Sequence, residues 1–459
     1  MLEFTVLEEV LGKAVSTGGD FAEIFIEDRF SSSIGMIDGA IENAVSGRDF
    51  GAGIRVYSGF KSVYVYTNNV TRKGLLEAAE KAADAISLTR KTNIGSLTES
   101  IAVNKHPITF MPSSVAGTRK ADIVRRAYKA AKEYSPEIVQ VSAGYADVEQ
   151  EIYIANTEGL YTRDKRVRTR IYIQAVAGSG SENQTGFEGP GGSRGFEIFD
   201  EIDVEEYARN ASRTAVAMLH AEVCPADRMT VVIEGGFGGV IFHEACGHSL
   251  EATSVAKGNS VFAGKLGEKI ASDVVTAIDD GTIPNGWGSY NIDDEGFPAR
   301  KNILIENGIL RSYMVDRLNG RRMGMEPTGN SRRQSYRYAP TSRMTNTYIA
   351  AGNSDDKDII ASVPYGLYAR KMGGGSVNPV TGEFNFAVAE GYIIKNGQID
   401  KPVRGATLIG KGADVLMKID MVGKNVSLGQ GMCGSLSGSV PTNVGQPMIR
   451  VSEMTVGGR

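Results

Sequence analysis

The sequence of 459 residues has few of the features that mark disulfide-stabilised, membrane-spanning or nucleic-acid-binding proteins. It contains only three cysteines, Cys224, Cys246 and Cys433, an odd and sparse set that does not suggest a disulfide framework. No run approaches the roughly 18 apolar residues of a membrane span, and a net charge of −4 gives no reason to expect nucleic-acid binding. The N-terminal segment is acidic and amphipathic, unlike a signal peptide, so we expect a cytoplasmic protein.

Glycine, in contrast, is abundant, with 56 residues, so the chain is expected to be rich in strands, tight turns and bulges. The length exceeds what one compact core accommodates and predicts more than one domain. We place the boundary in the proline-bearing connection 221–228, which gives an N-terminal domain 1–222 and a C-terminal domain 223–459.

The N-terminal half alternates helical and strand-like periodicity. Short alternating runs between residues 21 and 66, and again between 137 and 178, indicate antiparallel meanders. Residues 179–195 form a polar, glycine-rich segment that reads as a loop. The order helix, meander, helix occurs twice, which suggests an internal duplication of topology. The predicted helices cover 4–17, 72–88, 118–134 and 201–219.

The C-terminal half begins with a buried strand, 229–234, followed by a glycine turn and a predicted helix over 237–250. Beyond residue 260 the pattern is short strands and turns. Asn307-Gly308 and Asn396-Gly397 lie between apolar runs, which is a strong hairpin signal. The sequence therefore predicts an α+β protein, with an N-terminal α/β domain of helices and antiparallel meanders and a mostly antiparallel β C-terminal domain.

The predicted helix 237–250 contains two of the four histidines in the chain, in the segment HEACGH (243–248). The spacing resembles the His-Glu-x-x-His of zinc peptidases but has one residue more. In a straight α-helix, residues five apart point about 140° away from each other, so His243 and His248 could not share an ion. We therefore expect one metal-binding helix with a local distortion, either a π-bulge or a break at Gly247.

The spacing alone leaves the ligand set open. Cys246 lies three residues after His243, on the same face of a straight helix, and pairs with it as well as His248 does. A third protein ligand is needed for a catalytic zinc site. His106, His220 and Cys433 are the candidates, and a helix with packed histidines and no metal is the alternative.

Three further features have ordinary explanations beside functional ones. Glu251 could support His248 or be a solvated helix residue. The acidic segment IDDEG (292–296) could hold a second metal, but its Asp and Gly content favours a turn. The arginines between 317 and 333 could grip a substrate carboxylate or a partner, and a solvated or interface face is the default reading.

Taken together, several longer segments resemble the TldD family of metallopeptidases, which forms the TldD/TldE (PmbA) system. The resemblance runs over most of the chain and is strongest from residue 229 onward. The segments that carry it are HEACGHSLEA (243–252), IDDEG (292–296), LIENGIL (304–310), MVDRLNGRRMGMEPTGNSRR (314–333), RMTNTYI (343–349), GGG (373–375), KPVRGATLIG (401–410), MCG (432–434) and VGQP (444–447).

The resemblance implies that His243, His248 and Cys433 bind Zn²⁺ and that Glu244 is the general base and acid of an endopeptidase for short or unfolded peptides. It also implies a TldE-like partner subunit, with a homodimer as the alternative. Two other functions remain open at this point. One is a regulatory or scaffold protein with a structural metal, as in the gyrase-modulator description of family members, and the other is a small-amide hydrolase similar to peptide deformylases.

Overall fold

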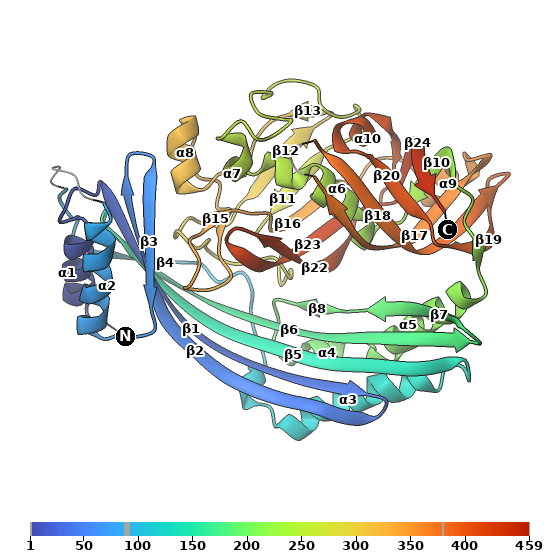
Figure 1. Ribbon diagram of the computed structural model, residues 1–459, viewed down its shortest axis with the longest axis horizontal. Helices are drawn as coiled ribbons and strands as arrows, with labels where there is room; N and C mark the ends of the chain where they lie inside the picture. Colours follow the sequence, from blue (N-terminus) through green and yellow to red (C-terminus); the bar gives the residue numbers. More distant parts are fainter. Residues whose placement is uncertain (1, 87–91, 379–380, 459) are drawn as a thin grey trace.

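The computed structural model describes residues 2–86, 92–378 and 381–458. A long, curved sheet from the N-terminal half lies beneath a β-rich C-terminal part, which faces the concave side of that sheet (Figure 1). The structure confirms a mixed α and β fold built mainly from antiparallel sheets. Among the described residues, no helix is long and apolar enough to cross a membrane.

The N-terminal sheet has the strand order β3-β2-β1-β5-β6-β4, with β7 and β8 also paired to β6. Its strands are β1 (Phe21–Ile37), β2 (Ala40–Ser58), β3 (Lys61–Thr67), β4 (Thr98–Ile101), β5 (Ile138–Asn156), β6 (Leu160–Ser179), β7 (Glu182–Glu188) and β8 (Gly191–Gly192).

These strands are longer than the sequence predicts. The short runs expected between residues 21 and 66 are joined here, because the β1–β2 ladder runs through the polar residues 31–33 and turns only at Asp38-Gly39, where both φ angles are positive (46° and 86°). The predicted loop over 179–195 is also wrong in part, since Glu182–Glu188 extends the sheet as β7 on β6. Polar side chains tolerated on one face of a long strand explain both errors.

Helices cover the other face of this sheet and its end (Figure 1). α3 (Gly117–Lys132) and α5 (Val204–Leu219) share one apolar core with β5 and β6, and α4 (Ile198–Glu201) precedes α5. α1 (Phe4–Ala14) and α2 (Arg72–Asp84) share another core with β1 and β2. All four long predicted helices are present, although the predicted end of the second, at residues 87–88, lies outside the described residues.

The C-terminal part contains two larger sheets. One has the order β17-β10-β24-β20-β18-β19-β9, with β21 on β24, and the other has the order β13-β12-β11-β16-β23-β22. Both predicted Asn-Gly hairpins occur, with positive φ at both turn residues in each.

The elements of this part are β9 (Glu222–Val223), β10 (Asp227–Ile233), η2 (Gly236–Gly239), α6 (Val240–Ala245), η3 (Gly247–Leu250), α7 (Ala252–Val255), β11 (Ala277–Asp280), β12 (Lys301–Glu306), β13 (Ile309–Leu310), α8 (Arg317–Met323), β14 (Ser331–Arg332), β15 (Thr341–Ser342), β16 (Asn346–Ile349), α9 (Asp356–Ala361), β17 (Tyr365–Val377), β18 (Glu383–Lys395), β19 (Gln398–Arg404), β20 (Thr407–Lys411), α10 (Gly412–Lys418), β21 (Ile419–Val422), β22 (Ser427–Ser435), β23 (Gly438–Gln446) and β24 (Ile449–Gly457).

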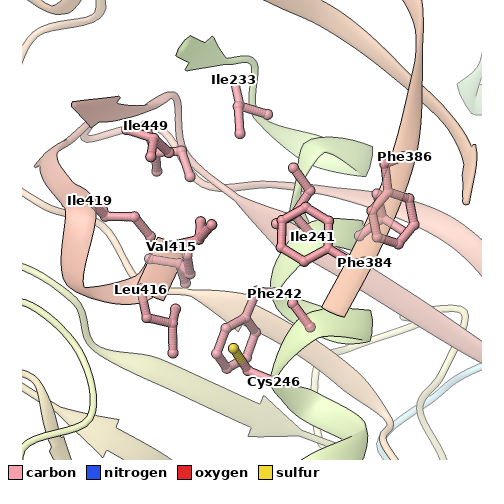
Figure 2. Packing of buried hydrophobic residues seen from close by; sticks show 14 of the residues in the cluster. Ile233, Ile241, Phe242, Cys246, Phe384, Phe386, Val415, Leu416, Ile419 and Ile449 are labelled. Atoms are coloured by element: carbon pink, nitrogen blue, oxygen red, sulfur yellow. The ribbon is translucent and has the colours of Figure 1, made fainter. Parts of the chain in front are cut away.

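The short helix α6 is embedded between the sheets. Ile241 and Phe242 lie among apolar side chains of β18, α10 and β24, which Figure 2 shows around them. Since α6 is surrounded by protein, the residues on it are held by packing rather than by a surface loop. The helices α8, α9 and α10 were not predicted, because each has only six or seven residues and too little periodicity to recognise.

Buried ion pairs join the two halves of the chain. Asp294 accepts from Arg166 at 2.7 Å, and Glu295 accepts from Arg55 at 3.1 Å. The IDDEG segment is thus a turn, as its composition favours, but its carboxylates contact the N-terminal sheet.

The arginines predicted to form a solvated or interface face divide into two groups. Arg332 and Arg333 are buried, each only 4% exposed, and Arg333 pairs with Glu23 at 3.0 Å. Arg317 and Arg321 pair with Glu158 and Asp20 of the N-terminal half. These side chains therefore serve mainly to join the halves of the chain.

Candidate metal centre

The first histidine of the HEACGH segment is positioned by a close backbone approach. β10 ends at Ile233, and the chain then passes through the turn at Gly235-Gly236 into η2 and α6. A Cβ on Gly239 would lie 2.4 Å from the carbonyl oxygen of Gly445 in β23, so only glycine allows this approach. The side chain of His243 follows on α6 and is buried, with 3% exposure.

The helix does not continue to His248. α6 ends at Ala245, Cys246 adopts φ −131° and ψ −45°, and Gly247–Leu250 forms a separate 3₁₀ turn. The expectation that one helix over 237–250 carries both histidines is therefore not confirmed. Of the two distortions that the spacing calls for, the structure has the break, located at the residue before Gly247.

This break brings the two histidines onto one side. Their ring centroids lie 5.1 Å apart, with the ring planes at 85°. A Cβ on Gly247 would lie 2.2 Å from Met344 Sδ, so the turn packs too tightly for a larger residue without movement of that side chain. The residue that a straight helix could not accommodate is absorbed in the change from α-helix to 3₁₀ turn.

Cys433, on β22, completes the group. Its Sγ lies 3.3 Å from His243 Nε2 and 3.5 Å from His248 Nε2, and the three atoms lie within 4.8 Å of one another. Ligand atoms that share a tetrahedral zinc ion with Zn–N near 2.0 Å and Zn–S near 2.3 Å are about 3.5 Å apart. The two distances from Cys433 Sγ to the histidine nitrogens fit such an ion.

The other candidate ligands lie elsewhere. The thiol of Cys246 is in the apolar core beside Phe242 (Figure 2), and burial raises its pKa far above the usual value. His220 pairs with Glu137 at 2.8 Å on the surface, and His106 accepts from the backbone N–H of Asn285. None of these three side chains belongs to the group formed by His243, His248 and Cys433.

The electrostatics of the group favour a thiolate beside the imidazoles. Burial opposes ionisation of the Cys433 thiol, but His243 and then His248 outweigh it and lower its pKa well below the usual value. Burial likewise works against a charged His248, but the Glu251 carboxylate and the Cys433 sulfur raise its pKa well above the usual value. A cation in place of these protons would satisfy the same thiolate and carboxylate.

The glutamates of the segment take different positions. Glu251 Oε2 lies 3.2 Å from His248 Nδ1, on the side of the ring away from Cys433, and its own side chain is only 4% exposed. Glu244 Oε2 lies 3.7 Å from His248 Nε2, and this side chain is 29% exposed. Glu251 therefore orients a histidine, whereas Glu244 stands at the open side of the group.

Sequence reasoning missed one residue of the site, Arg343. This fully buried arginine donates to the carbonyl oxygen of Cys433, and its Nε lies 3.9 Å from Glu251 Oε1. Arg343 thus contacts Glu251, which supports His248, and also the backbone of Cys433 itself. Arg343 begins the RMTNTYI segment (343–349), which is one of the segments that carry the family resemblance. Its position in the sequence gave no indication that it lies near the histidines.

Comparisons with known proteins cover almost the whole chain. Three family models match, described as PmbA/TldA metallopeptidase domain 1 (residues 22–86), central domain (111–219) and C-terminal domain (226–458). A curated protein of Haemophilus influenzae named Metalloprotease TldD homolog is 38% identical, over 96% of this chain and 93% of its own length.

Two further proteins add detail. A Zinc metalloprotease TldD homolog of Saccharolobus solfataricus is 32% identical, over 57% of this chain and 58% of its own length. The crystal structure of TldE from Thermococcus kodakarensis has the same fold, with a TM-score of 0.80 and 19% identity over 99% of this chain and 100% of that chain. These matches show that the chain belongs to the PmbA/TldD family of metallopeptidases.

Proposed function

We propose that this protein is a zinc-dependent endopeptidase in which His243, His248 and Cys433 hold the ion. The observation that carries the proposal is the convergence of three ligand atoms within 4.8 Å from segments almost two hundred residues apart. One histidine is braced by a carboxylate, as metal-bound histidines usually are. Three protein ligands leave one position open, which is typical of catalytic rather than structural zinc sites.

A zinc ion bound there would supply Lewis-acid activation of a water molecule and of the scissile carbonyl. Glu244 then acts as the general base, because its carboxylate stands at the partly exposed side of the group, where a water molecule can reach it. It takes the proton of the attacking water and returns it to the leaving amine. Glu251 keeps the Nε2 atom of His248 turned toward Cys433 Sγ by holding its Nδ1 atom, so that this Nε2 atom would be available to an ion.

The substrates we propose are short or unfolded peptides in an extended conformation. β22, which carries Cys433, is the edge strand of its sheet and pairs only with β23 among the described residues. A peptide that adds to such an edge is recognised mainly through its backbone, so little side-chain preference is expected. The subunit arrangement we propose is a pair with a TldE-like chain, with a homodimer as the alternative.

The decisive experiment replaces the proposed base. The Glu244→Gln variant should keep its zinc and fold but lose cleavage of an unfolded peptide by a factor of about 10² to 10⁴. Zinc content and peptide cleavage are measured on the same preparation, with a TldE-like subunit added. The exposed residue Glu268, changed to Gln, is the matched control and should leave both unchanged. Full activity in Glu244→Gln would refute the assigned role.

A further inference from the structure

A cavity of about 310 Å³, separate from the candidate metal centre, lies where the N-terminal sheet faces the β22–β23 hairpin. Its walls come from β1, β5 and β6 on one side and from β14 and the hairpin on the other. We call it the arginine pocket, because six arginines line it: Arg29, Arg166, Arg168, Arg170, Arg332 and Arg333. Trp287, Met432 and two aspartates, Asp147 and Asp294, also contribute to the lining.

The two aspartates of the pocket are already paired. Asp294 accepts from Arg166 at 2.7 Å, and Asp147 accepts at 2.6 Å from Lys120, which lies outside the lining. Arg333 finds its carboxylate partner in Glu23, which also lies outside the lining. The acidic groups nearby therefore neutralise only some of the positive charge.

Four arginines of the pocket, Arg29, Arg168, Arg170 and Arg332, form no ion pair with any carboxylate of the described chain. Arg168 donates to the backbone carbonyls of Trp287 and Ser289, at 3.0 and 3.1 Å. Arg332 donates to the carbonyls of Met344 and Pro441, both at 2.6 Å. Carbonyl oxygens satisfy hydrogen bonds and fix the direction of the guanidinium groups, but they carry no charge to balance them.

Two observations indicate that the described chain does not fully balance the charge and the hydrogen-bond donors of these arginines. The Nε atoms of Arg29, Arg170 and Arg333 are buried without a hydrogen-bond partner in the described structure. Burial, followed by the charges of Arg332 and Arg166, lowers the pKa of Arg168 to about 9. Buried guanidinium charges are costly unless an opposite charge accompanies them.

We propose that the arginine pocket binds a compact anion that carries carboxylate or phosphate groups. Planar guanidinium forks recognise these groups through paired N–H donors. Met432 lines the pocket, whereas its neighbour Cys433 belongs to the metal group. Since successive residues of a strand face opposite sides, the anion lies across β22 from the proposed zinc and is not a ligand of it.

The same chemistry can come from a free anion or from the carboxylate terminus of a peptide, and binding measurements separate them. Inorganic phosphate is titrated into the full-length protein by calorimetry at constant ionic strength. The test variant is Arg170→Gln, because this half-buried side chain has a single hydrogen bond within the described residues, to Gly189 at 3.4 Å, and its loss should not unfold the protein. Arg29→Gln, from β1 of the same wall, replaces it if that variant does not fold.

Two controls accompany the titration. Arg163→Gln removes an exposed arginine that lies on the other face of the same strand, β6. His243→Ala removes a proposed zinc ligand and so reports phosphate bound at the metal. We expect phosphate affinity to fall at least about tenfold in Arg170→Gln, the loss of one charge-assisted hydrogen bond, and to be unchanged in both controls.

The second arm compares penta-alanine with a free and with an amidated C-terminus, in the Glu244→Gln background so that no cleavage occurs. A preference for the free carboxylate that depends on Arg170 supports the proposal and names the peptide terminus as the source. Because this arm measures binding only, it stands even if the peptidase proposal fails. Anion binding that is unaffected by Arg170→Gln in both arms, or is lost only in His243→Ala, overturns the proposal.

Discussion

The two cysteines nearest the histidines offer the sharpest test of the ligand set, because they differ in surroundings but not in chemistry. Cys433 Sγ contacts both imidazoles, at 3.3 and 3.5 Å. Cys246 lies closer in sequence, yet its thiol is 1% exposed within the apolar core. We therefore expect Cys433→Ser and Cys246→Ser to have opposite effects on metal binding and on stability.

The expected magnitudes follow from these surroundings. Loss of a side chain that only supports a ligand weakens metal binding about 10–100-fold, so loss of the ligand Cys433 should exceed about 100-fold. In Cys246→Ser the new hydroxyl has no partner in the core, and burying it costs about 1–3 kcal/mol of folding free energy. Metal affinity should not change in that variant, because the Cys246 side chain is not among the three ligand groups.

Both quantities can be measured on the same samples. Metal content after dialysis and a competition titration with a chelator give the affinity, and denaturant unfolding of the metal-free protein gives the stability. Cys433→Ser should lose the metal while the metal-free protein keeps most of its stability. If Cys246→Ser loses the metal and Cys433→Ser retains it, the ligand set proposed from this geometry is wrong.

Three other substitutions test the surroundings of the site and the contact between the halves of the chain. Glu251→Gln should weaken zinc binding about 10–100-fold without abolishing it, measured by chelator competition, because a neutral amide orients the imidazole less firmly. Gly247→Ala should cost about 1–3 kcal/mol in denaturant unfolding, since its Cβ would meet Met344 Sδ at 2.2 Å, and Met344→Ala should recover part of the loss. Burial opposes ionisation of Glu390, but Arg213, at 2.9 Å, and the hydrogen bond from Tyr392 together outweigh it and lower the pKa of Glu390 from 4.5 to about 2. Between these two pH values the unfolded chain binds a proton at Glu390 and the folded chain does not, so acid favours unfolding. The wild type should therefore exceed Glu390→Gln in free energy of unfolding by at most about 3 kcal/mol above pH 5, and this difference should fade toward pH 2. Thermal unfolding at a series of pH values measures it.

Helical periodicity and hairpin turns identified the long helices and several of the strands, but the site needed more than periodicity. A straight helix would point His243 and His248, five positions apart, in different directions, so a distortion was required, and the chain supplies a break at Cys246. The choice of Cys433 over Cys246 could not come from spacing, because contacts between residues that far apart depend on how the sheets pack. It came from resemblance, and the ligand role of Cys433 stays a proposal that its 3.3 Å distance to His243 Nε2 supports. The division into domains 1–222 and 223–459 stays a prediction.

The charged residues between the halves of the chain were the least predictable feature. Aspartate, glutamate and arginine are usually solvated, so a sequence rich in them reads as surface. Here Glu23, Asp294 and Arg333 are buried, each less than 5% exposed, because complementary charges from distant segments meet at the sheet. Such pairs contribute little stability over apolar residues, but breaking one leaves an uncompensated charge, so they specify how the halves of the chain fit together.

The precision of the proposed metal centre has the same origin in contacts between distant segments. The histidines follow β10, a strand of the eight-stranded sheet in the C-terminal part, whereas Cys433 lies on β22 of the six-stranded sheet. Gly239 packs against Gly445 of β23, and Arg343 donates to the carbonyl of Cys433, so both approaches are fixed by backbone contacts. A site built in this way is held by rigid elements on both sides, which is the condition for ligand atoms to keep their spacing before the ion arrives.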